Sequence, residues 1–269
     1  ALIALRSEWK HLIELQLVAL VPLEYWSTQR GDTFAKYVAS VGGLLGGVFL
    51  PPFDRNLSGD LLFQFLHLAN ALGCGIDLHI DESQSSAAVG LKLLLKALEQ
   101  VENKVSITCS HLSSMALLGQ QKLSQLAEKL FSYKVNVVAL PLTNSWLLGR
   151  KDRSTLIKRP LAPIFQLQKA GVVVAVGGDN VNDSWFPLSS FDPINLMAFS
   201  LSIAHLSPWD RLGLSPFSTS AAHLLGLEWK GNLGIGSPVD WVLLDSKSWV
   251  EALSSKPKKR VVVNGKFLD

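Results

Sequence analysis

Histidine and carboxylate side chains lie at the ends of three short apolar segments of this sequence. His79 and Glu82 end the first segment, His111 ends the second and Asp179 ends the third. Imidazole and carboxylate groups are ligands of Zn²⁺ and Fe²⁺, and a nearby carboxyl group can move protons to and from a reacting molecule. If the three segments meet in space, we expect a divalent metal ion and proton-transfer chemistry at one site.

Each of these residues also has an ordinary structural explanation when it is taken alone. Polar and apolar residues alternate in the first segment, which in a strand places Asp77, His79 and Asp81 on one face. There His79 could equally be a hydrogen-bonded core histidine, with Glu82 as the cap of the next helix. A single histidine in a serine-rich turn, such as His111, is more often structural. The functional interpretation therefore depends on the combination.

The glycines before Asp179 allow the backbone to turn closely around a site, although a plain tight turn has the same sequence. No Gly-x-Ser-x-Gly motif accompanies the serines near His111, which disfavours a nucleophilic serine. No Gly-x-Gly-x-x-Gly loop leads into a helix, which disfavours dinucleotide binding. A site that combines His79, His111 and Asp179 remains the strongest hypothesis.

The segments that position these groups alternate regularly with amphipathic helical stretches. Hydrophobic periodicity predicts helices at 2–14, 33–41, 60–72, 86–101, 118–131 and 161–170, and strands at 15–20, 44–50, 75–80, 105–109, 135–140 and 172–176. Repeated helix-then-strand order with apolar strands indicates a parallel sheet covered by helices. In an α/β barrel the reactive groups lie at the C-terminal ends of the strands, as they do here.

The number of strands and the last part of the chain define the predicted fold class. A closed (β/α)₈ barrel has eight strands, whereas six are predicted here and the sequence opens inside a helix. We therefore expect an α/β fold of the TIM-barrel type, seen in metal-dependent hydrolases, without its first two strands. Residues 1–230 are predicted to form this partial barrel, and residues 231–269 to form the C-terminal part of a small β-sandwich domain that ends in a hairpin.

Composition excludes several classes of protein. With 269 residues, 48% of them hydrophobic and only 17% charged, the chain can bury a large core and is not disordered. Its net charge of +3 comes from scattered basic residues rather than a basic patch, so nucleic acid is not expected as a partner. No apolar run is long enough to span a membrane. Cys74 and Cys109 lie in apolar runs, which favours a reducing compartment, hence the cytoplasm.

The motifs resemble those of the amidohydrolase superfamily, and specifically of its cytosine deaminase branch. Residues 77–82 resemble that branch's Asp-x-His-x-Asp-Glu strand, and residues 108–111 resemble its Ser-His strand end. Residues 136–150 resemble the segment between, and residues 178–188 resemble the last barrel strand and its loop. The similarity runs along nearly the whole chain, and the order and spacing of its motifs are specific.

The resemblance implies a role for each reactive side chain. By it, His79 and Asp179 would bind one divalent metal ion, Zn or Fe(II), which lowers the pKa of bound water. Glu82 would be the proton shuttle, His111 would assist the attacking hydroxide, and Asp179 would also accept a proton. Trp185 would help to wall the substrate pocket. Homo-oligomer formation is implied only by this resemblance.

The chain also departs from the pattern of the cytosine deaminases. Leu23 and Glu24 occupy the place of the family's substrate-binding glutamine, and Asn180 replaces the second carboxylate of its Asp-Asp pair. Leu23 cannot form a hydrogen bond with the pyrimidine carbonyl, which costs about 1 to 3 kcal/mol unless Glu24 or another group replaces it. We therefore expect these three residues and Trp185 to contact the substrate, and related cyclic amidines are as plausible as cytosine.

The predicted function is metal-dependent hydrolytic deamination of a cytosine-like nitrogen heterocycle, a small molecule, with release of ammonia. The His-x-His pair of the family's first strand does not occur in the sequence, so this chain should bind metal weakly and turn over little by itself. Two alternatives remain open. One is a catalytically incomplete relic that binds a ligand or partner, and the other is hydrolysis of a cyclic amide.

Overall fold

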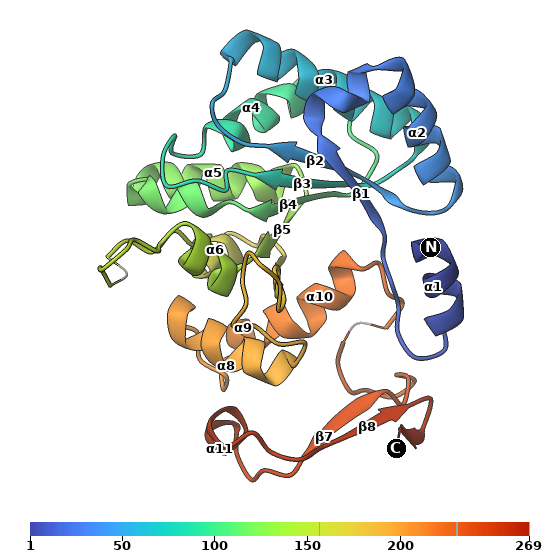
Figure 1. Ribbon diagram of the computed structural model, residues 1–269, viewed down its shortest axis with the longest axis vertical. Helices are drawn as coiled ribbons and strands as arrows, with labels where there is room; N and C mark the ends of the chain where they lie inside the picture. Colours follow the sequence, from blue (N-terminus) through green and yellow to red (C-terminus); the bar gives the residue numbers. More distant parts are fainter. Residues whose placement is uncertain (156, 230, 269) are drawn as a thin grey trace.

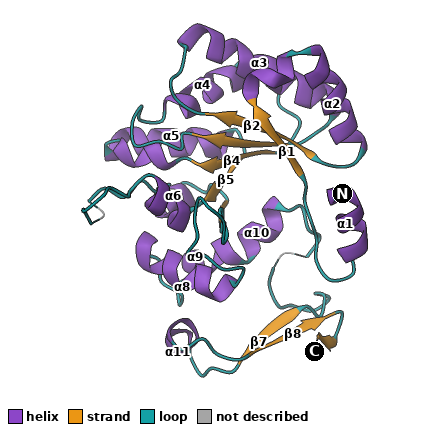
Figure 2. Ribbon diagram, in the orientation of Figure 1, coloured by secondary structure: helices purple, strands orange, loops and turns teal. Residues whose placement is uncertain are grey.

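A computed structural model of the chain describes residues 1–155, 157–229 and 231–268. Within them, six parallel strands form one sheet in which each strand pairs with the next along the chain (Figures 1 and 2). The strands are β1 (Val18–Pro22), β2 (Leu44–Phe49), β3 (Ile76–Ile80), β4 (Ile107–His111), β5 (Val135–Ala139) and β6 (Val174–Val176).

Helices connect consecutive strands, as the right-handed crossovers of a parallel sheet require. The connections contain η1 (Leu23–Ser27), α2 (Gln29–Ser40), α3 (Arg55–Leu72), α4 (Val89–Leu98), η2 (Ser113–Leu117), α5 (Gln120–Ser132), α6 (Pro141–Leu147) and α7 (Ile164–Lys169). The helix α1 (Leu2–Trp9) precedes the sheet, and α8 (Pro193–Ala204), α9 (Arg211–Leu214), η3 (Ser215–Phe217) and α10 (Thr219–Leu224) follow it. Within the described residues, no helix has both the length and the apolar character needed to cross a lipid bilayer.

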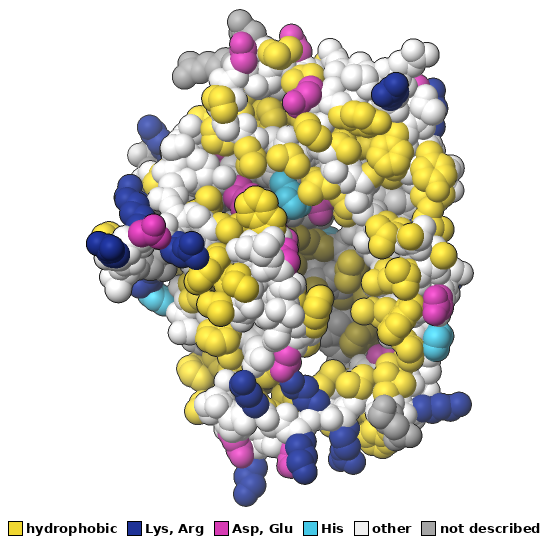
Figure 3. All heavy atoms as spheres, in the orientation of Figure 1, with side chains coloured by type: hydrophobic (Ala, Val, Ile, Leu, Met, Phe, Trp, Pro, Cys, Tyr) yellow, Lys and Arg dark blue, Asp and Glu magenta, His cyan; other side chains and the backbone are white. Residues whose placement is uncertain are grey.

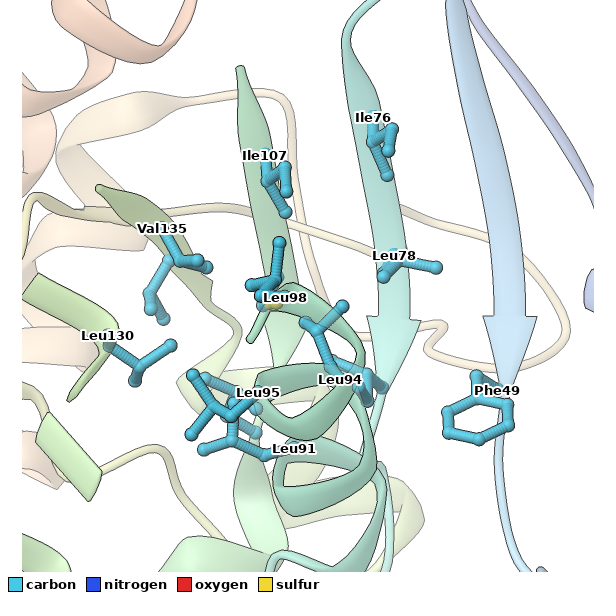
Figure 4. Close-up of a cluster of buried hydrophobic side chains, with 14 of the residues drawn as sticks. Phe49, Ile76, Leu78, Leu91, Leu94, Leu95, Leu98, Ile107, Leu130 and Val135 are labelled. Carbon is cyan, nitrogen blue, oxygen red and sulfur yellow. The ribbon is translucent and has the colours of Figure 1, made fainter. Parts of the chain in front are cut away.

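The main core lies between the outer face of the sheet and the helices that cover it. Figure 4 shows strand side chains such as Ile76, Leu78 and Ile107 pointing toward leucines of α4, among them Leu91 and Leu94. All five side chains are at most 1% exposed. Each such leucine or isoleucine contributes about 1.5 to 3 kcal/mol by its burial, so this layer fixes the strand ends that carry the reactive groups.

The opposite, inner face of the sheet is partly open to solvent. Asp77 and His79 alternate with the buried residues of β3 and are only partly buried. On the edge strand β1 the apolar side chains of Val18 and Leu20 are 38% and 42% exposed. In Figure 3, hydrophobic side chains gather over the side on which α1 and β1 lie, and the surface is hollowed beside them.

The last part of the chain forms a separate three-stranded antiparallel sheet. It comprises β7 (Trp241–Leu244), β8 (Lys259–Val263) and β9 (Lys266–Leu268), with the helix α11 (Trp249–Ser254) between β7 and β8. Asn264 and Gly265 both have positive φ angles, as a tight hairpin turn requires. Lys259 forms an ion pair with Asp192, the N-cap of α8, and so links this sheet to the barrel.

The structure confirms the predicted fold class: an α/β fold in which six barrel strands are followed by a β appendage. The predicted first helix and strand are shifted, because the helix ends at Trp9 and β1 begins only at Val18. The predictions missed α6, and the predicted strand at 172–176 is shorter. Residues 230 and 269, which bound the predicted domains, lie outside the described residues, so this domain division stays a prediction.

Candidate active site

The strand β3 presents Asp77 and His79 on the inner face of the sheet. Alternation along β3 buries Ile76, Leu78 and Ile80 beneath the helices and so turns the two polar side chains the other way. The hydroxyl of Ser110 on β4, which pairs with His79, donates to Asp77 Oδ1 at 3.0 Å. Burial raises the pKa of Asp77, and the adjacent His79 opposes that rise.

His111 reaches the same face by a different route. It is paired with Ile80, and regular strand geometry would send its ring outward with the Ile80 side chain. Instead, φ is +74° at His111 and +47° at Leu112, an uncommon left-handed pair that turns the chain at the end of β4. His111 Nε2 then lies 3.2 Å from His79 Nδ1, with the ring centroids 4.8 Å apart.

The buried side of the His111 ring contacts Asn144 of α6. Asn144 Nδ2 lies 3.0 Å from His111 Nδ1, and both side chains are almost completely buried, at 0% and 1% exposure. Asn144 was not among the site residues predicted from the sequence. The usable signal was Pro141, which occupies the first turn of α6, since proline at that position commonly begins a helix.

Glu82 completes the cluster from the turn after β3. Its Oε1 lies 3.6 Å from His111 Nδ1. Burial, with repulsion from Asp179, raises the pKa of Glu82 to about 7, and burial beside His79 lowers the pKa of His111 to about 3. The histidine is therefore neutral at pH 7, so its contact with Glu82 is not an ion pair. A carboxyl group that titrates near neutrality is suited to exchange protons in both directions.

Asp81 does not share the inner face with Asp77 and His79, so that expectation was wrong. Its φ angle of +56° turns it away at the end of β3, and its side chain is 1% exposed. The carboxylate accepts hydrogen bonds from the backbone N–H groups of Gly90 (3.0 Å) and Leu91 (2.8 Å) at the start of α4. The helix cap that the sequence suggested for Glu82 is thus supplied by Asp81, which leaves Glu82 free for the site.

Asp179 approaches the cluster from the loop after β6. Its Oδ2 lies 4.0 Å from His111 Nε2, and its side chain is 42% exposed. Burial raises the pKa of Asp179, the nearby His79 lowers it, and Asp183 raises it. Four ionisable side chains from three strand ends thus meet at one rim of the sheet: His79, Glu82, His111 and Asp179. On this face of the molecule Figure 3 shows a histidine among acidic side chains.

The loop that follows Asp179 is held by its own polar groups. Asp183 Oδ1 accepts from the backbone N–H groups of Trp185 and Phe186, both at 2.9 Å. Asn180 Nδ2 donates to Asp183 Oδ2 at 3.0 Å. Asn180 also lines a cavity of about 680 Å³ between this loop and α8, within the size range of small-molecule sites. The Trp185 side chain is 64% exposed and lines a different surface pocket, with Trp146 and Arg150.

The structure does not bring Leu23 to the cluster. Leu23 begins η1 directly after β1 and is 2% exposed, packed in the same core as Phe65 and Leu78. Burial of an apolar side chain in the core between the sheet and its helices stabilises the fold more than exposure on the open inner face would. Glu24, the next residue, is exposed. Of the expected substrate contacts, only Asn180 lies directly beside a member of the cluster.

The described residues supply part of a metal site. His79 offers a ring nitrogen and Asp179 a carboxylate, both of a type that Zn²⁺ and Fe²⁺ accept. Among the residues that the structure describes, no group of three or more histidine, cysteine or acidic side chains is arranged to hold a metal ion. A stable zinc site takes three or four protein ligands, so these residues by themselves do not fit a tightly held ion.

Comparison with known proteins places this arrangement in context. Residues 52–268 match the sequence profile of the Amidohydrolase family. A pterin deaminase of Rhizobium rhizogenes (strain K84 / ATCC BAA-868) is 31% identical over 271 residues, covering 98% of this chain and 60% of that protein. An N-isopropylammelide isopropyl amidohydrolase of Pseudomonas sp. (strain ADP) is 25% identical over 275 residues, covering 100% of this chain and 64% of that protein.

Solved structures show the same fold. The crystal structure of 5-methylcytosine deaminase from Klebsiella pneumoniae liganded with phosphonocytosine has a TM-score of 0.84 and 24% identity. That comparison covers 100% of this chain and 66% of the other. The chain therefore spans less than two thirds of the length of each of these three proteins.

Proposed function

Because this chain belongs to the amidohydrolase family, we propose that its rim of strand ends serves the hydrolytic deamination of a nitrogen heterocycle. The reacting group would be an amidine edge, in which an amino group is attached to a ring carbon beside a ring nitrogen. Water replaces the amino group, the ring gains a carbonyl, and ammonia leaves. The observation that carries this proposal is the meeting of His79, His111 and Glu82 within hydrogen-bonding or near-contact distances at the ends of β3 and β4.

Glu82 is the residue that we assign to proton transfer. Its pKa of about 7 allows it to take a proton from the attacking water and return one to the ring nitrogen. The second proton of the water, now on the new hydroxyl group, passes to the amino group as the carbon–nitrogen bond breaks, so the products are the ring carbonyl and neutral ammonia. His111, neutral and fixed by its contacts, orients the attacking oxygen.

Two residues are assigned to metal binding. His79 and Asp179 would hold one divalent ion, Zn²⁺ or Fe²⁺, together with ligands that these described residues do not supply. Such an ion lowers the pKa of bound water toward about 7. Asp179, whose pKa burial raises, would share a proton with the attacking water.

The substrate class is a cytosine-like ring or a related cyclic amidine, including pterins. Leu23 lies in the core and offers no hydrogen bond to a ring carbonyl, which disfavours strict selection of cytosine. Asn180 lies beside Asp179 and can both donate and accept, so it is suited to a ring edge that presents an N–H beside an acceptor. The 31% identity to a pterin deaminase supports including two-ring substrates.

Ammonia release tests the proposal. The complete product of the encoding gene, loaded with Zn²⁺ or Fe²⁺, is incubated with cytosine, pterin, isocytosine and guanine, and ammonia is measured. We expect release from at least one of them, reduced at least about 100-fold in Glu82→Gln, which keeps the shape but cannot exchange a proton. Hydrolysis of cyclic amides without ammonia from any of the four would overturn deamination and favour a cyclic-amide hydrolase.

A second candidate function follows from the incomplete set of metal ligands. As a separate unit, this chain would bind a heterocycle or a partner without turning it over, because His79 and Asp179 are too few to hold an ion firmly. We expect dialysed chain to retain well under one equivalent of Zn²⁺ by elemental analysis. One firmly retained ion per chain would contradict this second candidate.

A further inference from the structure

We infer that Asn144 is a positioning residue that fixes the tautomer of His111, so that the Nε2–H of His111 points into the site. This inference rests on the proposed function only for its effect on catalysis. The tautomer itself is a property of the chain and can be measured without any substrate or metal.

The geometry around Nδ1 assigns the proton. Asn144 Nδ2 lies 3.0 Å from His111 Nδ1. Glu82 Oε1 lies 3.6 Å from the same nitrogen, beyond hydrogen-bonding distance, so the closer Asn144 amide decides. An amide nitrogen can only donate, so Nδ1 must accept and carries no proton. In the neutral ring the proton is then on Nε2, the nitrogen that lies 3.2 Å from His79 Nδ1 and 4.0 Å from Asp179 Oδ2. Both of these neighbours can accept a hydrogen bond.

The orientation of the Asn144 amide is supported by its surroundings. In this orientation the buried Oδ1 has no hydrogen-bond partner within the described part of the chain. If the amide were turned over, Oδ1 would face His111. The two N–H groups of Nδ2 would then occupy the buried position where Oδ1 has no partner. Unpaired buried N–H donors are rarer in proteins than under-satisfied carbonyl oxygens. The orientation with Nδ2 toward the ring therefore leaves the smaller deficit.

Asn144 is held rigidly enough for this task. It lies in α6, where its backbone N–H donates to Leu140 at 3.0 Å, and its side chain is fully buried. Fixing the proton on Nε2 gives the site a hydrogen-bond donor on the side of the ring that faces His79 and Asp179. The opposite tautomer would present a lone pair there, which can accept a hydrogen bond but cannot donate one to the oxygen of an attacking water or of the substrate.

Nitrogen NMR of chain labelled with ¹⁵N in its histidine rings tests the assignment. The His111 signals are identified by their loss in His111→Gln. We expect Nδ1 to show the shift of an unprotonated ring nitrogen and Nε2 that of a protonated one. In Asn144→Asp, whose carboxylate accepts but does not donate, the proton should move to Nδ1. In Asn144→Leu, which has a similar shape and no polar atom, both tautomers should be populated.

A matched control comes from the next position in α6. Ser145 Oγ is also buried and has no hydrogen-bond partner among the described residues. Ser145→Ala therefore removes a buried polar atom from the same helix and leaves the Asn144 amide in place. Its His111 signals should match those of the wild type. A protonated Nδ1 in the wild type would overturn the inference, whatever the signals of Asn144→Asp and Asn144→Leu show.

Catalysis provides the second readout. In the complete gene product, Asn144→Leu should lower kcat about 10- to 100-fold, as is typical when a partner that orients a functional histidine is lost, with KM within about threefold of the wild type. An unchanged kcat alongside an altered tautomer would overturn the catalytic part. If the wild type released no ammonia, the proposed function would fail while the NMR result still decided the tautomer.

Discussion

The candidate site has two halves that are built differently. One half lies at the ends of β3 and β4, and the other lies on the loop after β6. His111 and Asn144 are at most 1% exposed and hold each other inside the barrel wall. Asp179 has a side chain that is 42% exposed, on a loop held by the turn around Asp183. The first half is therefore part of the protein core, whereas the second is fixed mainly by local hydrogen bonds.

This contrast means that stability and chemistry are coupled at one half of the site and separable at the other. Replacing a residue at the ends of β3 and β4 should change both the free energy of unfolding and the activity. Replacing a residue in the loop after β6 should change mainly the activity.

The largest difference is expected between His111→Ala and Asp179→Ala. Removing the His111 ring leaves a cavity and an unpaired Asn144 amide, which should lower the free energy of unfolding by about 3 to 5 kcal/mol. Asp179→Ala should change it by less than about 1 kcal/mol, since the side chain is partly exposed. Urea denaturation followed by circular dichroism measures both. Equal losses in the two variants would show that the contrast is absent.

A matched pair of aspartates sharpens the comparison. Asp81 and Asp183 each accept two backbone N–H groups, but Asp81 is buried and Asp183 is exposed. Asp81→Ala should lower the free energy of unfolding by about 2 to 3 kcal/mol, because it leaves the start of α4 without its buried acceptor. Asp183→Ala should cause a clearly smaller loss in the same denaturation experiment. The contrast would be refuted if Asp183→Ala were the more harmful change.

The smallest effect concerns the charge on Glu82 and depends on pH. Burial raises its pKa from 4.5 to about 7 in the folded protein, so the folded state binds this proton more tightly than the unfolded state. The stabilisation that comes from this tighter proton binding is fully present below pH 4.5, and it is lost as the pH rises to about 7. Glu82→Gln cannot lose that proton, so relative to the wild type it should gain about 1 to 3 kcal/mol across this window, after allowance for solvent screening.

Denaturation midpoints of both proteins at several pH values between 4 and 8 would measure this gain. Asp32→Asn is a suitable control, because Asp32 forms an exposed pair with Lys36 on the helix α2. The difference in stability between Asp32→Asn and the wild type should not grow with pH in this way. A constant difference between Glu82→Gln and the wild type would mean that Glu82 titrates normally and is not prepared for proton transfer.

The sequence predicted the strand periodicity and the residue types of the site better than their final orientation. Alternation in β3 is a local property, and it correctly placed Asp77 and His79 on the inner face. The inward turn of His111 and the outward turn of Asp81 depend on left-handed backbone angles at strand ends. Such angles are uncommon outside glycine and leave no clear mark in the residue pattern.

Contacts between distant segments were the least predictable. Asn144 meets His111 across 33 positions of the chain, and nothing in its local sequence indicates that contact. Leu23 was assigned to the substrate pocket from the resemblance, yet its apolar side chain lies with Phe65 and Leu78 in the core. In both cases tertiary packing decides the direction of the side chain, and packing is not encoded in periodicity.

Crystallography of the complete gene product with Zn²⁺ is the most direct test of the central claim that the strand ends of β3, β4 and β6 form one metal-assisted site. Anomalous scattering locates the ion without reference to activity. We predict an ion within about 2.0 to 2.2 Å of a ring nitrogen of His79 and a carboxylate oxygen of Asp179, with Glu82 and His111 beside it. An ion bound elsewhere, with His79 and Asp179 not among its ligands, would contradict the account.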